Sequence, residues 1–286
     1  MAQLSVILPA HNEAAVIQRT LRSILASRFD GPLQVIVVAN GCSDGTAELA
    51  RGFGPPVEVI DTPVGNKVHA LNLGDRQARY FPRAFMDADV ELSPTALQSV
   101  VDAFAEPGVR LVAPDCRHLY RGWNPLLAGY YQLWRSLPYV RNATMGRGFY
   151  AIDQELRRRF DEFPPLTGDD KFIRNLAEPS ERRIARGGFS TVYMPATLRE
   201  LLAVKTRWTY GNLELGQQRS DLNSNDTEQH TGGLRHVLAR PWLWPHLPLF
   251  VFVYWYSHRA AGRLLRQRQG GWGRANSSRR AEQRDG

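Results

Sequence analysis

The chain has 286 residues, and its 43% hydrophobic and 22% charged residues are ordinary for a globular protein, which excludes intrinsic disorder for most of its length. Its two cysteines, Cys42 and Cys116, cannot build a disulfide framework or a cysteine-rich metal site. The length suits one large α/β domain, with or without a short appendage. The first residues lack the basic and apolar segments of a signal peptide, so we expect the folded body to be cytoplasmic.

The net charge of +8 is concentrated near the C-terminus. Residues 257–286 carry eight arginines against Glu282 and Asp285, so the rest of the chain is close to neutral. A dedicated nucleic-acid-binding protein presents a broad basic face, and no zinc-finger spacing, RNA-recognition motif or leucine heptad accompanies the basic tail. We therefore expect no nucleic-acid partner.

In the first half of the chain, short apolar runs alternate with amphipathic stretches. The runs predict buried strands at residues 4–9, 34–39, 57–60, 84–86 and 110–113, and the stretches predict helices at residues 13–27, 46–52, 68–80 and 93–105. Ser93 is the expected N-cap of the last helix, with Pro94 at its first position. This alternation predicts a mostly parallel sheet with helices on both faces, whose ligands bind beyond the carboxyl ends of the strands. The expected functional loops are therefore residues 11–13, 40–45, 65–67 and 87–89.

The second half is less regular. We expect a helix over residues 123–137, a glycine-punctuated strand from Gly146, and a helix from about Asp170. The polar stretch 217–233 has the composition of a mobile loop. It is a candidate lid that closes over a bound substrate.

An apolar, aromatic-rich run precedes the basic tail. Eighteen residues without a formal charge separate Arg240 from Arg259, which is marginal for a hydrocarbon core about 30 Å thick. Tryptophan and tyrosine at both ends, followed by arginines, are typical of an interfacial segment on an anionic cytoplasmic leaflet. We expect membrane contact through residues 241–268; a spanning helix, a buried core helix and a dimer contact are the alternatives.

Two carboxylates, Asp87 and Asp89, follow the strand predicted at residues 84–86. Side chains two residues apart in an extended backbone share a face. Such a pair at the open end of a parallel sheet can hold one Mg²⁺ or Mn²⁺ together with substrate phosphates. An Asp-x-Asp sequence by itself also occurs in loops as solvated charge.

An ordered set of motifs surrounds this pair. The segments are SVILPAHNE at 5–13, VVANGCSDGT at 37–46, GNKVHALNLG at 65–74, GRGFYAID at 146–153, TGDDKFI at 167–173, and Arg207-Trp208. Together they resemble the family 2 glycosyltransferases, which are inverting enzymes with the GT-A fold. The similarity covers about residues 4 to 212.

The resemblance implies a domain organisation. It predicts a GT-A (Rossmann-like) α/β domain over residues 1–232, with a nucleotide-binding half at about 1–115 and an acceptor half at about 116–232. The C-terminal apolar and basic membrane-associating segment then covers residues 233–286.

The resemblance also implies roles on the donor side. Asp89, with Asp87, would hold a divalent ion that neutralises the departing diphosphate. Lys67 could pair with a phosphate or with an acidic neighbour, and Arg207 could match the diphosphate in bidentate fashion. The implied donor-binding residues are Pro9, Ala10, Glu13, Asn40, Asp44, Lys67, Asp87, Arg207 and Trp208. Glu13 stabilising a helix N-terminus, and Arg207-Trp208 as a surface arginine beside a core tryptophan, are the alternatives.

On the acceptor side, inversion requires a base that takes the proton from the attacking hydroxyl. The family places an acidic pair at the start of a helix, which here is Asp169-Asp170, with Asp170 as the base and Asp169 in support. Ordinary N-terminal capping is the alternative. Adjacent acids must be treated as coupled titrating groups. Gly148 and Phe149 are the implied contacts with the acceptor or the sugar.

The sequence departs from the family pattern at three places. Ala39 and Asn40 stand where acids are common, which leaves the identity of the nucleobase open, although Asn40 could substitute. The acidic pair is Asp-Asp in place of Glu-Asp. Val204 occupies the position of a glutamine found in processive synthases, so we expect transfer of a single sugar.

We therefore expect a metal-dependent inverting glycosyltransferase that moves one sugar from a nucleotide-diphosphate sugar to an acceptor hydroxyl, with Mg²⁺ or Mn²⁺ as cofactor. A lipid-linked or envelope-glycan acceptor and a peripheral or C-terminally anchored position at the cytoplasmic face of the membrane follow from the C-terminal segment. A non-catalytic nucleotide- or glycan-binding scaffold is one alternative. A sugar-1-phosphate nucleotidyltransferase is another, but such enzymes open with a glycine-rich phosphate loop that residues 11–13 do not provide.

Overall fold

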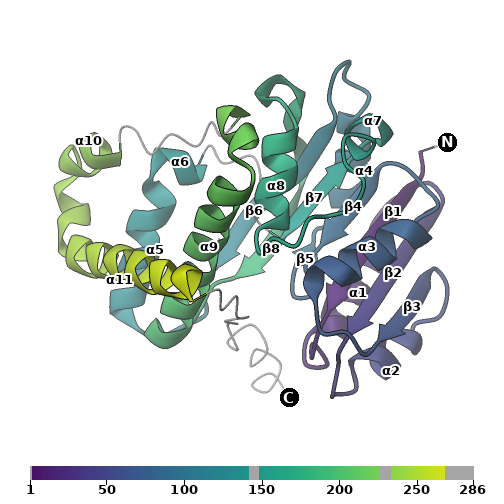
Figure 1. Cartoon of the computed structure of the whole chain (residues 1–286), viewed down its shortest axis with the longest axis horizontal. Helices are drawn as coiled ribbons and strands as arrows, with labels where there is room; N and C mark the ends of the chain where they lie inside the picture. The colour runs from purple at the N-terminus through teal and green to yellow at the C-terminus, as the bar shows by residue number, and fades with distance from the viewer. Residues whose placement is uncertain (1, 142–147, 226–232, 268–286) are drawn as a thin grey trace.

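A computed structural model describes residues 2–141, 148–225 and 233–267 (Figure 1). Within these residues, one eight-stranded sheet runs in the order β3-β2-β1-β4-β7-β6-β8-β5. The strands are β1 (Leu4–Ala10), β2 (Leu33–Asn40), β3 (Val57–Thr62), β4 (Arg83–Met86), β5 (Glu91–Leu92), β6 (Leu111–Leu119), β7 (Phe149–Ile152) and β8 (Arg182–Tyr193).

The sheet is parallel in its first half and mixed in its second. β3, β2, β1 and β4 pair in parallel, and β6 pairs in parallel with β8. β7 lies antiparallel between β4 and β6, and β5 lies antiparallel to β8. The predicted parallel sheet is therefore confirmed in part, because β7 enters the sheet in reverse and joins its two halves.

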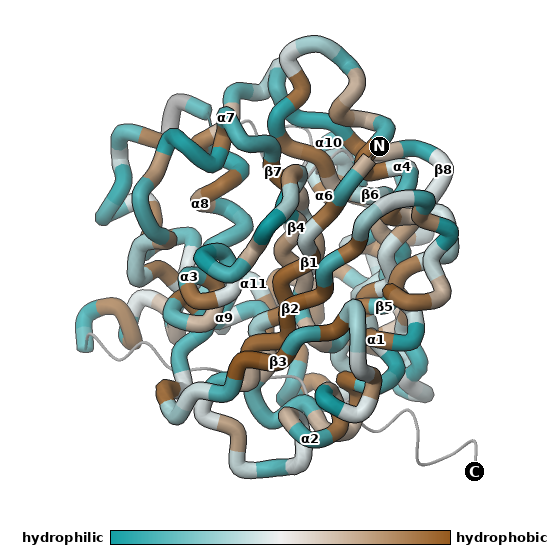
Figure 2. The backbone as a smooth tube through the Cα atoms, turned by 90° about the vertical axis from the view of Figure 1, so that its right-hand side faces the viewer, coloured by the Kyte–Doolittle hydropathy of each residue, from teal (hydrophilic) through white to brown (hydrophobic). Residues whose placement is uncertain are grey.

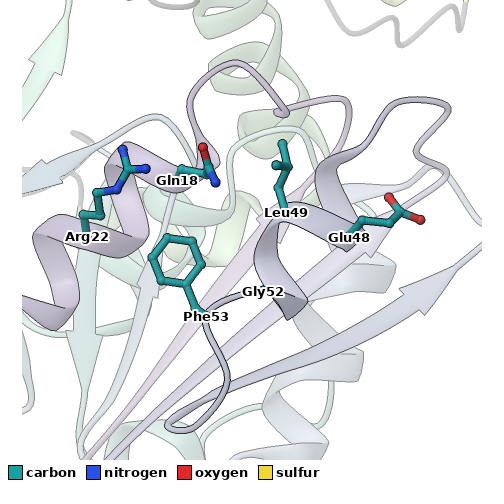
Figure 3. A pocket seen from close by; sticks show the side chains of 6 residues that line it. All are labelled: Gln18, Arg22, Glu48, Leu49, Gly52 and Phe53. Atoms are coloured by element: carbon teal, nitrogen blue, oxygen red, sulfur yellow. The ribbon is translucent and has the colours of Figure 1, made fainter.

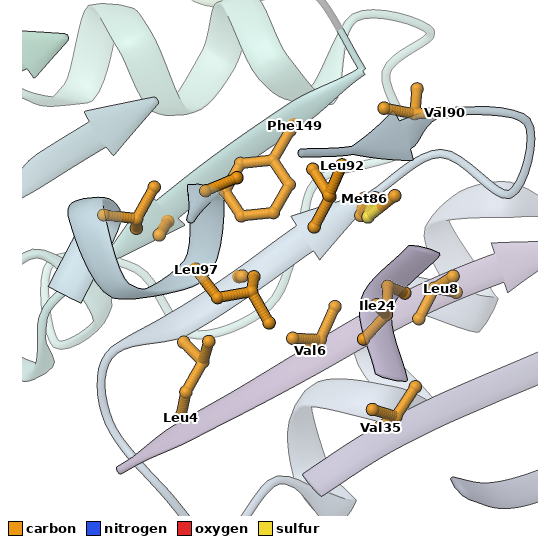
Figure 4. Close-up of a cluster of buried hydrophobic side chains, with 14 of the residues drawn as sticks. Leu4, Val6, Leu8, Ile24, Val35, Met86, Val90, Leu92, Leu97 and Phe149 are labelled. Atoms are coloured by element: carbon orange, nitrogen blue, oxygen red, sulfur yellow. The ribbon is translucent and has the colours of Figure 1, made fainter. Parts of the chain in front are cut away.

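Helices cover both faces of the sheet, as the alternation of apolar residues predicts. Leu4, Val6 and Leu8 of β1 point into a core beneath α1 (Ile17–Leu25) and α4 (Ala96–Ala103), and Figure 4 shows part of this cluster. The intervening Ile7 points to the opposite face, beneath α3 (Lys67–Gln77). α2 (Thr46–Arg51) packs beside β3 at the sheet edge. In Figure 2, β1 and β2 form a hydrophobic band through the middle of the molecule.

The predicted start of the fourth helix is wrong. α4 begins at Ala96, with Thr95 as its N-cap. The Ser93 amide donates to the Phe189 carbonyl over 2.9 Å, and the Ser93 hydroxyl accepts from the Phe189 amide over 2.9 Å. Ser93 therefore fastens the chain to β8, and this long-range pairing displaces the local capping role.

A buried ion-pair network connects the two halves. Asp75 of α3 accepts from Arg83 Nη1 at 2.8 Å and from Arg157 Nε at 2.7 Å. The Asp75 side chain is 3% exposed. Arg157 lies in α7 (Gln154–Arg157), so this carboxylate ties the first half of the sheet to the segment that follows β7.

The predicted acceptor half is largely helical. Its longer helices are α5 (Pro125–Ser136), α8 (Asp169–Leu176) and α9 (Leu198–Gln218), and the short ones are α6 (Pro138–Arg141), η1 (Pro179–Glu181) and η2 (Ser220–Asn225). Asn124 caps α5 by accepting from the Leu126 amide at 3.0 Å. Thr197 and Glu200 form a capping box at the start of α9. α5 and α9 share a third hydrophobic cluster with the C-terminal elements.

Those elements are α10 (Gly233–Leu238), η3 (Pro241–His246) and α11 (Leu247–Arg266). α11 packs on α9 and α5, and its fully buried positions are Val253, Ser257 and Ala261. No helix in the described part of the chain is both long and apolar enough to cross a membrane. Of the predicted lid, residues 217–225 form the end of α9 and η2, and residues 226–232 lie outside the described residues, as does Gly146 of the predicted strand.

Candidate active site

The loops that follow β1, β2 and β3 interlock at one edge of the sheet. His11 Nδ1 hydrogen-bonds the carbonyl of Asn40, and Asn40 Nδ2 donates to the carbonyl of Ala10 at 2.7 Å. Gly41 has a φ of +58°, and a Cβ there would lie 2.6 Å from the Cα of Gly65. Only glycine permits this approach, so the three loops form one surface.

Asp44 fastens the loop that follows β1 to the start of α2. Its carboxylate accepts from the amides of Ala14 and Thr46, each at 3.1 Å, and from the Thr46 hydroxyl. The same hydroxyl accepts from the Glu13 amide at 2.8 Å. Burial alone would raise the pKa of Asp44, but these hydrogen bonds lower it below its ordinary value. Asp44 is therefore ionised and holds the loop in place.

Pro9, Ala10 and Asn40 are buried at the ends of their strands, and Glu13 is half-buried beside them. The side-chain Nδ2 of Asn40 donates to the carbonyls of Ala10 and Val38. Its Oδ1 is buried without a hydrogen-bond partner within the described residues. The structure thus brings the expected nucleotide-side residues together. Asn40 contributes by fixing the backbone rather than by presenting an exposed side chain.

Lys67, the first residue of α3, joins two carboxylates that lie far apart in the sequence. Its Nζ lies 2.8 Å from Asp87 Oδ1 and 2.9 Å from Asp169 Oδ1. Burial alone would lower the pKa of Lys67, but Asp169 and Asp87 raise it above its ordinary value. Of the two partners expected for Lys67, the acidic neighbour is the one present.

Asp169 is held from both sides. Its side chain is 7% exposed, and its Oδ2 accepts from the Tyr150 hydroxyl at 3.0 Å while its Oδ1 pairs with Lys67. The sequence analysis did not identify Tyr150 as a residue of the site. The signal was the alternation along its strand, which turns Tyr150 to the face opposite Phe149.

Asp170 differs from its neighbour. Burial and the adjacent Asp169 charge raise the pKa of Asp170 to about 6, and its Oδ1 accepts from the Lys171 amide at 2.8 Å. Asp169 forms an ion pair with Lys67. The Asp170 carboxylate, in contrast, titrates near neutral pH, where it can accept a proton. The roles expected for Asp170 as base and for Asp169 as its support stay predictions.

Gly148 shapes the backbone beside Asp87. The Asp87 amide donates to the Gly148 carbonyl at 2.8 Å. Gly148 has a φ of +74°, and a Cβ there would lie 2.6 Å from Val90 Cγ2 and 3.2 Å from Asp87 Oδ2. A glycine at this position therefore leaves room for the Asp87 carboxylate.

Phe149 is expected to approach a sugar through its backbone, and its side chain lies in the core. It is 2% exposed and packs in the core next to Val90 and Met86 (Figure 4). The side chain of Phe149 therefore cannot contact an acceptor in this structure. The strand that carries Phe149 is buried on both faces, so the residue supports the site from behind.

Arg207 and Trp208 lie on α9. Burial would raise the pKa of Asp87, but the charges of Lys67 and Arg207 lower it. One turn later, a Cβ on Gly211 would lie 3.3 Å from the Gly168 amide nitrogen, so α9 closely approaches the start of α8. Trp208 is 39% exposed, which excludes the core-tryptophan alternative.

The residues expected to hold a metal are accessible. The Asp87 side chain is 42% exposed, and Asp89 is half-buried. Within the described ranges, no group of three or more His, Cys, Asp or Glu residues could hold a metal. Two carboxylates are hard oxygen ligands that suit Mg²⁺ or Mn²⁺ if donor phosphates and water complete the coordination.

Two surface hollows lie away from this site. Figure 3 shows one of about 290 Å³ between α1 and α2, lined by Gln18, Arg22, Glu48, Leu49, Gly52 and Phe53. A larger one, of about 830 Å³, lies along α4 and β8. Neither contains a residue of the carboxylate cluster, so charge and hydrogen bonding identify the site.

Comparison with known proteins gives the family. The model of glycosyl transferase family 2 matches residues 5–147, half of the chain. The chain belongs to this family. The expected membership is confirmed, and the matched region contains the interlocked loops, Lys67 and the Asp87/Asp89 pair.

Two curated proteins match parts of the chain. Glycosyltransferase AglE of Haloferax volcanii is 30% identical over 122 residues, which are 41% of this chain and 40% of that protein. The 4,4'-diaponeurosporenoate glycosyltransferase of Staphylococcus aureus is 33% identical over 133 residues, which are 43% of this chain and 35% of that protein. The chain thus aligns with about two fifths of the length of these curated relatives.

Solved structures show the fold over nearly the whole chain. The mannosyltransferase PcManGT of Pyrobaculum calidifontis, in complex with GDP-Man and Mn²⁺, superimposes with a TM-score of 0.59 at 22% identity, covering 94% of this chain and 76% of that one. S. aureus TarS in complex with UDP gives a TM-score of 0.53 at 14% identity, covering 93% and 92%. The chain therefore has a GT-A-like fold that extends beyond the family match.

Proposed function

We propose that this family 2 protein is a metal-dependent inverting glycosyltransferase that moves a single sugar from a nucleotide-diphosphate sugar to an acceptor hydroxyl. The observation that carries the proposal is the Lys67 bridge between Asp87 and Asp169, with Asp170 next to it. The bridge holds Asp87, a proposed metal ligand, and Asp169, the neighbour of the proposed base, in one cluster. Donor and acceptor can therefore meet there.

The proposed reaction is a single displacement. The acceptor oxygen forms a bond to the anomeric carbon, the bond from that carbon to the diphosphate breaks, and the hydroxyl proton passes to Asp170. A carboxyl with a pKa of about 6 is ionised at pH 7 and still accepts a proton readily. Asp169 stays paired with Lys67 and Tyr150, and it supports Asp170 without receiving the proton.

On the donor side, Asp89 and Asp87 would hold Mg²⁺ or Mn²⁺ against the diphosphate, and Arg207 would add positive charge nearby. A bound divalent ion supplies charge neutralisation for the leaving group. PcManGT, a protein of the same fold, is described with GDP-Man and Mn²⁺. Ala39 is fully buried and its side chain has no polar atom, so the nucleobase is read by the backbone or by neighbouring residues.

The proposed acceptor is lipid-linked or an envelope glycan, and the proposed location is the cytoplasmic face of the membrane. The support is an exposed apolar surface on η3 and α11, formed by Val251 and by six aromatic residues, Trp242, Trp244, Phe252, Tyr254, Trp255 and Tyr256. Arg259, Arg263 and Arg266 follow on the same helix. Aromatic rings beside basic residues favour the headgroup region of an anionic bilayer.

A nucleotide-release assay tests the reaction. Wild-type protein is incubated with UDP-, GDP- and dTDP-sugars, with Mg²⁺, Mn²⁺ or EDTA, and with membrane extract as the acceptor source. We expect metal-dependent release of one nucleotide that the extract stimulates, and Asp89→Ala should lose metal-dependent donor binding. Donor binding without release from any donor would favour a non-catalytic scaffold and contradict the proposal.

A liposome test addresses the location. Trp255 is 55% exposed on α11, and Trp255→Glu should weaken sedimentation with liposomes containing anionic lipid. The matched control is Leu25→Glu, at an exposed apolar position on α1 far from this surface. Equal sedimentation of the two variants would contradict membrane contact through α11.

A further inference from the structure

A buried carboxylate on α9 holds the turn that precedes α8. Glu214 of α9 is 9% exposed. Its Oε2 accepts from the Thr167 amide at 2.7 Å, and its Oε1 accepts from the Tyr210 hydroxyl at 3.2 Å. Burial and the Glu214 charge raise the pKa of Tyr210, so this hydroxyl stays protonated and can donate. Both oxygens of the carboxylate are thus engaged by groups of the chain.

Glu214 has no cationic partner that would explain its burial. No lysine, arginine or histidine in the described part of the chain forms an ion pair with it, and its bonds run to an amide and a hydroxyl. Desolvating a carboxylate without an opposite charge is costly. The adjacent Leu215 already packs against Phe172 and Ile173 of α8, so apolar contact between the two helices does not require Glu214. The carboxylate is explained by the turn that it holds.

The turn before α8 has no cap of its own. The N-cap residue of α8 is Gly168, which has no side chain that could accept from the first amides of the helix. Gly211 of α9 lies directly against it, because a Cβ on Gly211 would lie 3.3 Å from the Gly168 amide nitrogen and 3.5 Å from Thr167 Cβ. In Figure 1, α8 and α9 run beside each other. The start of α8 is therefore fixed from α9 rather than by a local capping residue.

We propose that Glu214 is a positioning residue for the acid pair Asp169-Asp170. The two acids are the first residues of α8, directly after the turn whose Thr167 amide Glu214 binds. Misplacing a reacting group by about 1 Å can cost about 10²-fold in rate, so the hold on this turn controls kcat. Glu214 acts through the backbone and is not itself a catalytic residue. This inference rests on the proposed glycosyl transfer and adds a residue to its machinery.

Substitutions at Glu214 test the hydrogen bond. The amide oxygen of Glu214→Gln can still accept from Thr167, whereas Glu214→Leu leaves the Thr167 amide without its acceptor. We expect Glu214→Leu to lower kcat by about 10- to 100-fold with donor KM within about twofold of wild type, and Glu214→Gln to keep kcat within about threefold. The control Thr197→Ala removes the N-cap at the far end of the same helix and should leave kcat unchanged. Wild-type kcat in Glu214→Leu would overturn the proposal.

Two glycines on α9 give a test that a general change in helix stability cannot mimic. Gly211→Ala and Gly216→Ala both replace a helical glycine with a better helix former. A Cβ on Gly211 crowds the turn before α8, whereas a Cβ on Gly216 meets nothing within 4 Å. We expect Gly211→Ala to lower kcat by about fivefold or more and Gly216→Ala to keep the wild-type value. Equal kcat in the two variants would overturn the positioning of the acid pair by α9.

Hydrogen exchange follows the turn without turnover. We expect the Thr167 amide to exchange at least about tenfold faster in Glu214→Leu than in wild type or Glu214→Gln. The amides of β1, which pair within the sheet, should exchange alike in all three proteins and report that the fold is intact. Equal exchange of the Thr167 amide in wild type and Glu214→Leu would overturn the hold on the turn.

The failure of this inference can be told from the failure of the proposed function. If wild type is active and Glu214→Leu has the same kcat, the transfer stands and only the positioning role fails. If wild type releases no nucleotide from any donor, the proposed transfer fails and the positioning role fails with it, whatever the exchange of the Thr167 amide shows.

Discussion

The two halves of the sheet handle their polar groups differently. In the nucleotide half, Asp44 and Asp75 are satisfied by partners within the chain. In the acceptor half, Asp170 has a raised pKa and Lys205 lacks a carboxylate partner among the described residues. Asp44 and Asp75 are therefore fixed by groups of the chain itself, whereas under the proposed function a substrate would supply the partner of Asp170.

The largest expected effect is on the acceptor half. Asp170→Asn keeps the size of the side chain but removes the proposed base, so turnover should fall by about 10²–10⁴-fold. Donor binding measured by calorimetry should stay close to wild type, because the nucleotide surface is untouched. Near-normal turnover would show that Asp170 is not the base.

A comparable effect on stability is expected where the halves are joined. Asp75→Ala leaves Arg83 and Arg157 as partly buried charges without their carboxylate, and loss of one partner of a buried pair costs about 3–5 kcal/mol. Urea unfolding measures the loss. The control is Asp61→Ala, whose side chain is 49% exposed and pairs with Arg51, where we expect a change below about 1 kcal/mol. Equal losses in the two variants would contradict the buried network.

The pH dependence should report Asp170. The reaction needs the ionised carboxylate, so kcat should fall about tenfold per pH unit below a pKa of about 6. Asp169→Asn removes the neighbouring negative charge and should move this acid limb of the pH profile of kcat to lower pH. Lys67→Met removes a positive charge and should move the acid limb to higher pH. Because folding raises the pKa of Asp170, its contribution to stability is present below about pH 4 and is lost as the pH rises through about 6. An unchanged limb in both variants would contradict the assignment.

A smaller loss is expected at Gly148. Gly148→Ala places a Cβ at positive φ, which costs about 1–2 kcal/mol, and the new methyl crowds Asp87. Both the unfolding free energy and metal-dependent donor affinity should fall. The matched control is Gly45→Ala, where a Cβ would meet nothing within 4 Å. Similar values for the two variants would remove Gly148 from the site.

The smallest effect is expected at Tyr150. Tyr150→Phe removes only the hydroxyl that donates to Asp169, while the ion pair between Asp169 and Lys67 remains. We expect kcat to fall by less than tenfold and the acid limb to shift. A variant with unchanged kcat and an unchanged limb would show that Lys67 alone fixes Asp169.

The sequence predicted the features that depend on local pattern. Strands β1 to β4 and β6 and helices α1 to α4 lie where their periodicity placed them, apart from shifted helix ends, whereas the short β5 was not predicted. The motif order grouped Lys67, Asp87, Asp169 and Asp170 as candidate site residues. The reversed β7, the role of Ser93 and the buried position of Phe149 were missed. Each depends on a partner distant in sequence, such as Phe189 for Ser93, and no local pattern encodes it.

A lysine held between two indoles shows the same limit, with Lys205 Nζ 4.2 Å from the ring centroid of Trp134 and 4.4 Å from that of Trp208. Lys205 and Trp208 lie one turn apart on α9, which helical spacing predicts, but Trp134 comes from α5. Only the packing of α5 on the C-terminal helices brings the second indole to the lysine. The sequence therefore provided no reason to single out Lys205.

The stereochemistry of the product tests the central claim most directly. Once a donor and acceptor pair is found in the nucleotide-release assay, the anomeric configuration of the transferred sugar is read from the ¹H coupling constants of the first product formed. A single displacement with Asp170 as base predicts inversion, so that an α-linked donor gives a β-linked product. Retention of the donor's configuration would contradict the account.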